Sequence, residues 1–381
     1  MKTLELLDRL IAFPTVSSRS NRDCIGFIES YLRSHGIASV IVPSEDGAKA
    51  NLHATIGPNV PGGVVLSGHT DVVPVDEQSW SSDPFRLTVR DGRAYGRGAC
   101  DMKGFDAAVL AAVPAMCAAP LRHPVHLAFS YDEEVGCKGA PALVASLARS
   151  IATPALTIVG EPSGMAPINA HKGSLSFFTD VTGHTVHSSR IDLGVSAVMV
   201  AARLVTWFDD RLRQNQQHAH GANGFAPPYT TLHCGFIHGG SAANIVASSC
   251  RFVTDIRAIP QEDPLSYQSD YLAFVRGQIE PTMQGIARET GVEIVPRSHV
   301  PGLKPERSGA AATLVERLSG MPSSVVSYTT EAGIFQNASW SSVVCGPGDI
   351  AQAHQADEFI EIAQLDAADR FLGLLIQDMS A

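Results

Sequence analysis

Histidines and carboxylates recur in this 381-residue sequence directly after short, β-rich apolar runs. The residues are His69, Asp71, Glu133, Glu134, Glu161 and His354, and the runs that they follow are 64–66, 125–130, 157–159 and 341–345. In an open α/β sheet the carboxyl ends of the strands form the edge at which ligands bind, so we expect these side chains to converge on one crevice. Asp101 joins them from the glycine-rich stretch 96–104, which opens a helical pattern at Phe105.

Imidazoles and carboxylates without thiolates are a ligand set suited to a hydrolytic Zn²⁺. Two histidines with three carboxylates are too many for one open tetrahedral site, and two metals that share a carboxylate fit better. Each residue alone has a plainer interpretation: a lone histidine is usually a satisfied core or surface residue, Glu133 and Glu134 a solvated acidic pair, and Asp71 a helix cap. Their joint occurrence favours the metal site, because buried carboxylates are costly unless they are paired or coordinated.

Other chemistries find less support in the sequence. The stretch 96–104 has neither the Lys-Ser/Thr of a phosphate-binding loop nor the spacing of a dinucleotide fingerprint. Ser67, Ser81 and Ser163 lack the Gly-x-Ser-x-Gly context of a serine hydrolase. The seven cysteines are scattered without a Cys-x-x-Cys pair, which disfavours a disulfide framework and a zinc–thiolate site.

Composition predicts a globular protein with two domains. The chain is 45% hydrophobic and 17% charged, and its formal net charge of −10 argues against a nucleic-acid partner. No uninterrupted apolar stretch is long enough for a membrane span, so no membrane association is expected. Residues 1–13 have the pattern of an amphipathic helix rather than a signal peptide, and the expected location is the cytoplasm.

The elements that must position these residues fall into two patterns. In the first part of the chain apolar strand patterns alternate with helical ones, which predicts an α/β domain around a mostly parallel sheet; the segments are 63–67, 105–118, 125–130, 141–148 and 155–159. From Gly173 a strand, a helix, two strands and a long helix that Pro281 kinks predict an inserted α+β two-layer unit; these segments are 174–181, 194–210, 230–237, 249–258 and 264–289. We therefore expect a metal-binding catalytic domain over 1–172 and 290–381, with the insert at 173–289 and a polar surface loop at 213–228.

Five segments resemble, in order, the metal-site motifs of the dinuclear zinc amidohydrolases, a family that includes desuccinylases, aminoacylases and glutamate carboxypeptidases. They are SGHTDVVP at 67–74, GRGACDMKG at 96–104, DEEVG at 132–136, GEPS at 160–163 and HQADE at 354–358. Three more segments most resemble the acetylornithine deacetylase branch of that family, namely DMKGF at 101–105, HKG at 171–173 and YTTEAGIFQ at 328–336. The resemblance covers nearly the whole chain.

The resemblance implies a role for each residue of the cluster. Asp101 bridges two Zn²⁺ ions, for which Co²⁺ can substitute, and the peptide bond after it is cis. One site is completed by His69 and Glu161 and the other by Glu134 and His354, and Glu133 is the general base. Asp71 is an outer partner that orients His69. Ala356 departs from the family, in which proline is common at this position.

The resemblance extends to the insert. The segment GHTVHSS at 183–189 resembles the family's lid motif and implies that His187 stabilises the reacting oxyanion, although alone it suggests a capping or surface histidine. The segments 239–244 and 255–257 imply substrate binding by Asn244 and by Arg257, which alone suggests a salt bridge on a strand face. The histidines expected to be structural are His184, His218 and His220.

Glu331 lies in one of the segments that resemble the deacetylase branch, which makes it a candidate contact for a substrate ammonium. The alternative is a carboxylate that orders the loop before the strand at 341–345.

The function that the resemblance implies is hydrolysis of an N-acyl amide on an amino acid, with N²-acetyl-L-ornithine as the expected substrate and arginine biosynthesis as the setting. The alternatives are a desuccinylase, a carbamoyl-amino-acid hydrolase, or a dipeptidase or carboxypeptidase. A non-catalytic metal-binding scaffold is the alternative of a different class. The expected partners are the small substrate and, through the insert as a dimerisation and lid domain, a second copy of the chain.

Overall fold

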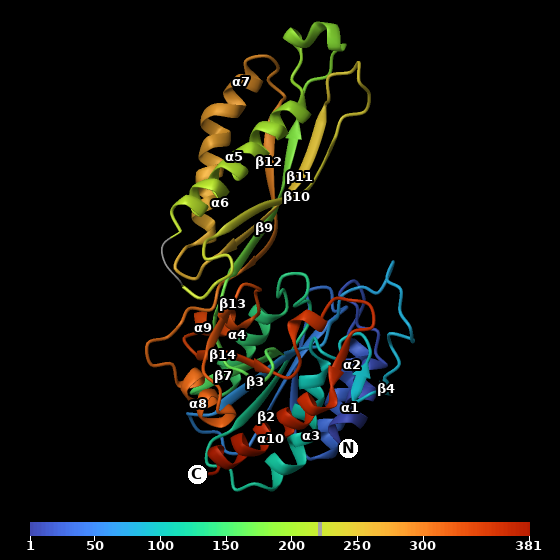
Figure 1. Ribbon diagram of the computed structural model, residues 1–381, viewed down its shortest axis with the longest axis vertical. Coiled ribbons are helices and arrows are strands. Elements are labelled where there is room, and N and C mark those ends of the chain that lie inside the picture. The colour runs from blue at the N-terminus through green and yellow to red at the C-terminus, as the bar shows by residue number, and fades with distance from the viewer. Residues whose placement is uncertain (220–222) are drawn as a thin grey trace. The chain divides into compact units, whose positions relative to one another are not determined.

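The protein consists of two compact units in the computed structural model, which describes residues 1–219 and 223–381 (Figure 1). The first unit comprises Met1–Ala170, Leu303–Val325 and Thr330–Ala381, and the second comprises His171–Gly302 and Val326–Thr329. The expected α/β class with an inserted α+β unit is confirmed. His220 lies outside the described residues.

The insert ends later than the expected residue 289. Strand β12 (Gly291–Val300) pairs antiparallel with β9 (Gly173–Thr182) from Gly291 opposite Thr182 to Val300 opposite Ser174. Because this pairing makes β12 part of the insert's own sheet, the chain returns to the first unit only at Leu303.

The first unit is built on an eight-stranded sheet in the order β1-β2-β6-β3-β7-β14-β8-β13. The strands are β1 (Ser39–Pro43), β2 (Ala50–Ile56), β3 (Val64–His69), β6 (Val125–Ser130), β7 (Leu156–Pro162), β8 (Ile168–His171), β13 (Ser324–Val326) and β14 (Ser341–Gly346). The four central strands, β6, β3, β7 and β14, run parallel. All residues of β3, β6 and β7 are buried, as is typical of parallel strands that are covered on both faces.

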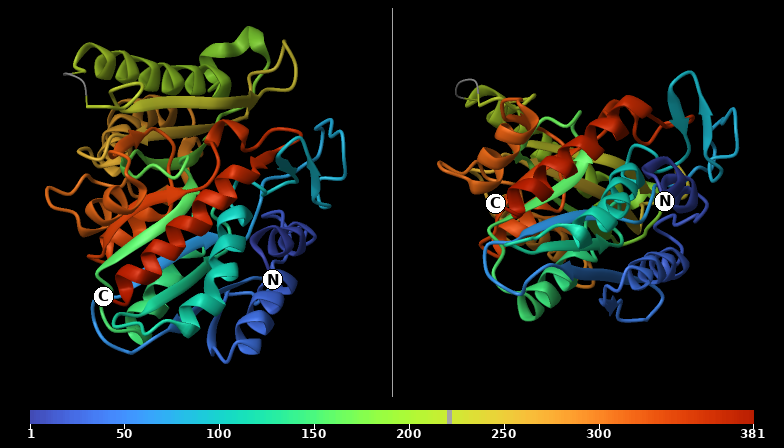
Figure 2. Two further views of the ribbon diagram at one scale, coloured as in Figure 1. Left: turned by 60° about the horizontal axis from the view of Figure 1, so that its bottom comes forward. Right: turned by 90° about the horizontal axis from the view of Figure 1, so that it is seen from below.

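Helices cover both faces of this sheet (Figure 2). They are α1 (Thr3–Ile11), α2 (Arg22–Ser34), α3 (Lys103–Ala118), α4 (Ala140–Ser150), α8 (Ala310–Ser319), α9 (Ala332–Asn337) and α10 (Ile362–Met379), with a short turn η3 (Ile350–Gln352). The amphipathic helix expected at the N-terminus is α1, whose Leu6, Leu7 and Leu10 are buried in the core. A small sheet of β4 (Thr88–Arg90), β5 (Arg93–Tyr95) and β15 (Phe359–Glu361) stands beside the main one.

The second unit has a four-stranded antiparallel sheet in the order β10-β11-β9-β12, with β10 at Thr231–Gly239 and β11 at Ser249–Ala258. Its helices are η1 (Ser188–Leu193), α5 (Ala197–Gln217), α6 (Pro264–Phe274), the π turn η2 (Val275–Ile279) and α7 (Glu280–Gln284). Phe177 of β9, Phe208 of α5, Phe252 of β11 and Tyr271 of α6 belong to one buried cluster between the sheet and the helices. Sheet and helices therefore form the two expected layers.

Two helix boundaries in this unit differ from the sequence-based expectation. Helix α5 continues to Gln217, through part of the expected loop 213–228, because arginine and glutamine are good helix formers. His218 follows as its C-terminal cap, with Nδ1 2.7 Å from the carbonyl oxygen of Gln214. The expected helix 264–289 ends at Gln284 and contains the π turn η2. This turn lies just before Pro281, which has no backbone N–H to donate within a helix.

Among the described residues, no helix combines the length and the apolar character that crossing a membrane requires.

Candidate metal centre

His69 is the last residue of β3, and its orientation is fixed by the backbone that follows it. Its Nδ1 lies 2.9 Å from the carbonyl oxygen of Asp71. Because a carbonyl oxygen only accepts hydrogen bonds, Nδ1 carries a hydrogen, which leaves Nε2 as the atom that a metal would bind. That Nε2 lies 2.9 Å from Oδ1 of Asp101, so the imidazole is set up to be a ligand.

Asp101 faces two imidazoles with its two carboxylate oxygens. Oδ1 is the atom near His69, and Oδ2 lies 3.3 Å from Nε2 of His354. The residue precedes α3, and the expected cis peptide bond between Asp101 and Met102 is confirmed. A carboxylate placed between two imidazoles has the geometry of a bridging ligand.

Two glutamates complete the cluster from neighbouring strand ends. Glu161, near the end of β7, has Oε1 3.7 Å from Nε2 of His69. Glu134, in the loop after β6, has Oε2 3.0 Å from Nε2 of His354. The structure thus brings together all five residues that the sequence proposed as ligands.

Within residues 1–219 and 223–381, ligand-type atoms that lie within 4.8 Å of one another form two groups of three, one of His69, Glu133 and Glu161 and one of His69, Asp101 and Glu134. The side chain of His354 is 52% exposed.

The electrostatics of the cluster favour bound cations. Burial raises the pKa of Glu133, Glu134 and Glu161, and neighbouring carboxylates raise it further. Burial also opposes the charge of Asp101, but hydrogen bonds with His354 and His69 lower its pKa. Several carboxylates crowded in a desolvated place repel one another, and divalent cations would neutralise this charge. The imidazole and carboxylate donors fit a hydrolytic divalent metal.

Asp71 lies beside His69 and also contacts the loop that follows β6. Its Oδ1 lies 3.6 Å from Nδ1 of His69 and accepts a hydrogen bond from the backbone N–H of Glu133 at 3.1 Å. Its Oδ2 accepts one from the hydroxyl of Ser17 at 2.6 Å. Asp71 therefore positions the backbone of the proposed base, while its carbonyl oxygen makes the closer contact to the imidazole.

Cys137 contacts the proposed base, and the sequence analysis did not single it out. Its thiol donates to Oε1 of Glu133 over 3.2 Å, and the residue is 3% exposed. Burial raises the pKa of this thiol, so it keeps its hydrogen and remains a donor. The only signal in the sequence was its place four residues after Glu133.

The residues proposed in the insert belong to the second unit and supply none of the grouped ligand atoms. His187 is exposed, and its Nδ1 accepts a hydrogen bond from the backbone N–H of Ser189. Arg257 donates from Nε to Asp255 over 2.9 Å and from Nη1 to Thr329 over 3.3 Å.

Asn244 and His184, which the sequence analysis also named, make contacts within the insert. Asn244 is exposed and its carbonyl oxygen accepts from the N–H of Ser188. His184, expected to be structural, contacts Glu289 at 2.5 Å.

The environment of Glu331 favours its structural alternative over contact with a substrate ammonium. The residue is 1% exposed. Its Oε1 accepts from the hydroxyl of Ser67 over 2.5 Å and its Oε2 from that of Ser130 over 2.9 Å. Because these serines lie on the neighbouring strands β3 and β6, the carboxylate links both strands to the start of α9, and the link occupies both of its oxygens.

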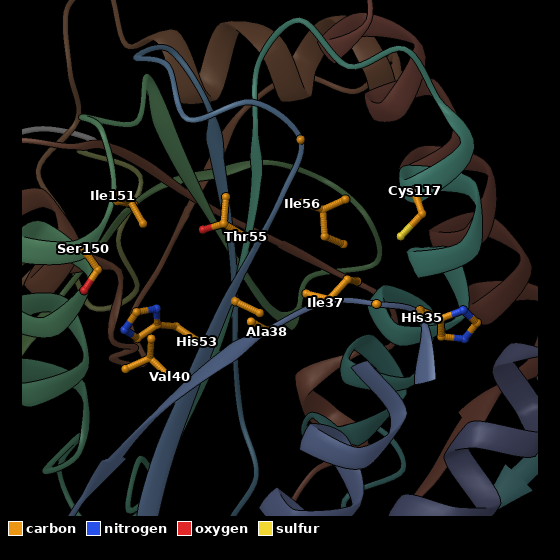
Figure 3. Close-up of a pocket in the computed structure, with 13 residues that line it drawn as sticks. His35, Ile37, Ala38, Val40, His53, Thr55, Ile56, Cys117, Ser150 and Ile151 are labelled. Carbon is orange, nitrogen blue, oxygen red and sulfur yellow. The ribbon is translucent and has the colours of Figure 1, made fainter. Parts of the chain in front are cut away.

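A separate hollow of about 400 Å³ lies against β1, β2 and the ends of α3 and α4 (Figure 3). His53, Thr55, Cys117 and Ser150 are among its lining residues, and none of the metal-centre residues lines it. The ring of His53 is already engaged with the hydroxyl of Ser146 at 2.9 Å. Neither an acidic side chain nor a lysine or arginine is among the described residues that line it.

The parallel sheet and the histidines and carboxylates at its carboxyl edge define the chain as a metal-dependent hydrolase. The sequence model of peptidase family M20/M25/M40 matches residues 65–378. The chain belongs to this family, which confirms the resemblance found in the sequence.

Known relatives agree with this membership. The chain is 35% identical over 382 residues to an acetylornithine deacetylase of Proteus mirabilis (strain HI4320), an alignment that covers 98% of this chain and 96% of the relative. A tripeptidase from Staphylococcus aureus has the same fold, with a TM-score of 0.76 and 20% identity over 100% of this chain and 98% of that one. An M20 family metallo-carboxypeptidase from Sulfolobus solfataricus has a TM-score of 0.76 and 18% identity over 99% and 100% of the two chains.

Proposed function

We propose that the protein hydrolyses the acetyl amide bond of N²-acetyl-L-ornithine to L-ornithine and acetate, as a step of arginine biosynthesis. The observation that carries the hydrolytic chemistry is Asp101 between His69 and His354, with Glu133 beside them. The substrate is supported by the 35% identity, over nearly the full length, to a relative named acetylornithine deacetylase.

The proposed cofactor is two Zn²⁺ ions per chain, with Co²⁺ as a possible substitute. Asp101 would contact both ions, His69 and Glu161 would hold the first, and Glu134 and His354 the second. When bound, such ions lower the pKa of a water molecule and polarise the acyl carbonyl group.

Glu133 supplies the proton transfers in this proposal. It accepts a proton from the attacking water and passes it to the leaving amine. Because the thiol of Cys137 donates to Oε1, Oε2 is the oxygen that exchanges the proton. Asp71 holds the backbone of Glu133 while this happens.

The insert is proposed to act as a lid that brings substrate-binding groups to the reaction. His187 would donate to the tetrahedral oxyanion, where a donor acts chiefly on the transition state. Arg257 would hold the substrate carboxylate with its planar guanidinium, and Asn244 would add an amide contact.

A panel of substrates tests the proposed function, with purified protein supplied with Zn²⁺ or Co²⁺. N²-acetyl-L-ornithine is expected to have the highest kcat/KM, with acetate released in equal amount to ornithine. The comparison substrates are an N-succinyl amino acid, an N-carbamoyl amino acid and a dipeptide. A higher kcat/KM on one of these would transfer the assignment to a desuccinylase, a carbamoyl hydrolase or a peptidase, and two bound metals without any hydrolysis would indicate a non-catalytic scaffold.

Glu331→Gln is expected to lower the stability and to reduce activity equally on charged and uncharged substrates. One carboxylate oxygen becomes an amide NH₂, which cannot accept from its serine, so that hydroxyl must turn to accept instead. Hydrogen bonds to a charged group become weaker neutral ones, at a cost of about 1–2 kcal/mol. Thermal unfolding and parallel kcat/KM values on N²-acetylornithine and N-acetylmethionine measure the two effects. Glu306→Gln is the matched control, because this exposed carboxylate also accepts from a serine, Ser341. A loss of activity that is confined to N²-acetylornithine would instead support a contact between Glu331 and the substrate ammonium.

We also propose a homodimer formed through the edge strand β10, in which Phe236 and Ile237 are 38% and 46% exposed. An edge strand with exposed apolar side chains can pair with a second copy of itself. Ile237→Asp is expected to shift the protein to a monomer in sedimentation experiments. Leu374→Asp, at a residue 43% exposed in the first unit, is the control that leaves the state unchanged. A monomeric wild-type protein would contradict the proposal.

The proposed location is the cytoplasm. All seven cysteines are free thiols, as is usual for proteins of reducing compartments.

A further inference from the structure

A buried ion pair joins the two loops that carry Asp101 and His354. Arg97 and Glu358 are each 1% exposed, and Nη1 of Arg97 lies 2.7 Å from Oε2 of Glu358. Neither residue belongs to the groups of ligand atoms. A buried ion pair needs further hydrogen bonds to offset its desolvation, so the other contacts of the two side chains show what the pair holds in place.

The carboxylate of Glu358 holds the backbone that leads into the proposed bridging ligand. Its Oε1 accepts from the N–H of Cys100 at 2.9 Å and from that of Asp101 at 3.1 Å. Its Oε2 accepts from the N–H of Gly98 at 3.0 Å, a residue with a φ of 82° that favours glycine. One carboxylate thus fixes the loop on which Asp101 stands.

The guanidinium of Arg97 holds the loop of His354. Nη1 donates to the carbonyl oxygen of Gln355 over 3.2 Å, and Nη2 donates to Oε1 of Gln78 over 2.5 Å. Nε2 of Gln78 in turn donates to the carbonyl oxygen of His354 over 3.0 Å. His354 has a φ of 63°, a conformation that a residue other than glycine keeps only where its surroundings enforce it.

We propose that Arg97 and Glu358 are positioning residues that set the separation between Asp101 and His354, and thereby the affinity of the metal position formed by Asp101, Glu134 and His354. The inference rests on the dinuclear centre of the proposed function. Metal sites require ligand distances within about 0.2 Å of their preferred values. Removing an outer partner of a ligand therefore typically weakens metal binding by about 10- to 100-fold.

Arg97→Lys tests the inference on the metal itself. Lysine keeps the charge beside Glu358 but cannot reach Gln355 and Gln78 at once. We expect stepwise titration of the metal-free protein with Zn²⁺ to show a first step close to that of the wild type. The second step is expected to be weakened about 10- to 100-fold. Elemental analysis and the visible spectrum of the Co²⁺ form report the same change without any assay of turnover.

Arg93→Lys is the matched control. Like Arg97, Arg93 pairs with a glutamate, with its Nη2 3.5 Å from Oε1 of Glu361. Its guanidinium lies over the ring of Phe359, but its side chain is 43% exposed. Two metal-binding steps with wild-type affinities are expected for this control.

Gln78→Ala removes the hydrogen bonds that Gln78 makes with Arg97 and with the backbone of His354. Gln78 lies half-buried in a surface loop, so this variant serves as the test if Arg97→Lys does not fold. Wild-type affinities at both steps in these variants would overturn the inference, and so would an equal weakening of both steps. If the wild-type protein itself binds fewer than two metals, it is the proposed dinuclear centre that fails.

Discussion

Replacing Glu133 with glutamine is expected to lower kcat by roughly 10²- to 10⁴-fold, the range for loss of a general base. Glutamine has the shape of glutamate but cannot accept a proton from the attacking water. The proposed ligands Asp101, Glu134 and Glu161 are untouched, so metal content is expected to stay at that of the wild type. The measurements are steady-state kinetics with the best substrate and elemental analysis of the same protein sample.

Asp132→Asn is the matched control for this variant. Asp132 is the adjacent acidic residue, but its carboxylate pairs with Lys49 and contributes no ligand atom. It has a φ of 57°, which asparagine tolerates well. The turnover of Asp132→Asn is expected to stay within about tenfold of the wild type. Loss of a general base lowers the rate by at least about 10²-fold, so the two results can be told apart. A Glu133→Gln protein that loses metal but keeps its rate per bound metal would show that Glu133 is a ligand and that Glu134 is the base.

Replacing Asp101 with alanine is expected to remove both metals and nearly all activity. Its two oxygens face His69 and His354 separately, so both metal positions lose a ligand together. Metal polarisation contributes several kcal/mol to catalysis, and each 1.36 kcal/mol is a factor of ten, so the rate should fall by more than about 10³-fold. Elemental analysis after dialysis and the kcat measure the two losses.

His354→Ala is the comparison that separates a shared ligand from an unshared one. The imidazole of His354 contacts Glu134 and Asp101, and its removal is expected to leave about one metal per chain under the proposed assignment. Circular dichroism establishes that both variants are folded. One retained metal in Asp101→Ala would contradict the bridging role.

The strands that carry the site could be predicted from local sequence because each has a local cause. Burial on both faces makes β3, β6 and β7 rich in apolar residues, and the chain direction decides which residues follow their carboxyl ends. The sequence therefore predicts His69 and Glu161 at the same edge of the sheet. The resemblance to the family then supplied the division of the ligands between two metals.

Boundaries were less predictable where pairing partners decide them. The pattern at 291–300 could belong to either unit, and only its pairing with β9 assigns it to the insert. Helix α5 likewise continues into a polar tract that has no apolar periodicity. In both places tertiary or helical hydrogen bonding outweighed the local pattern.

The sequence by itself determined the chemistry of this protein: which ligand types are present, on which strands, and in which order. The tertiary structure alone decided how Glu331 and Glu358 are used. Glu331 meets Ser67 and Ser130 across 264 and 201 residues of chain, and Glu358 meets Arg97 across 261. No local pattern encodes such contacts, because they depend on the order in which strands are placed in the sheet and on the packing of loops at its edge. The same residue type is therefore a proposed ligand at Glu134, a proposed base at Glu133 and the buried partner of Arg97 at Glu358.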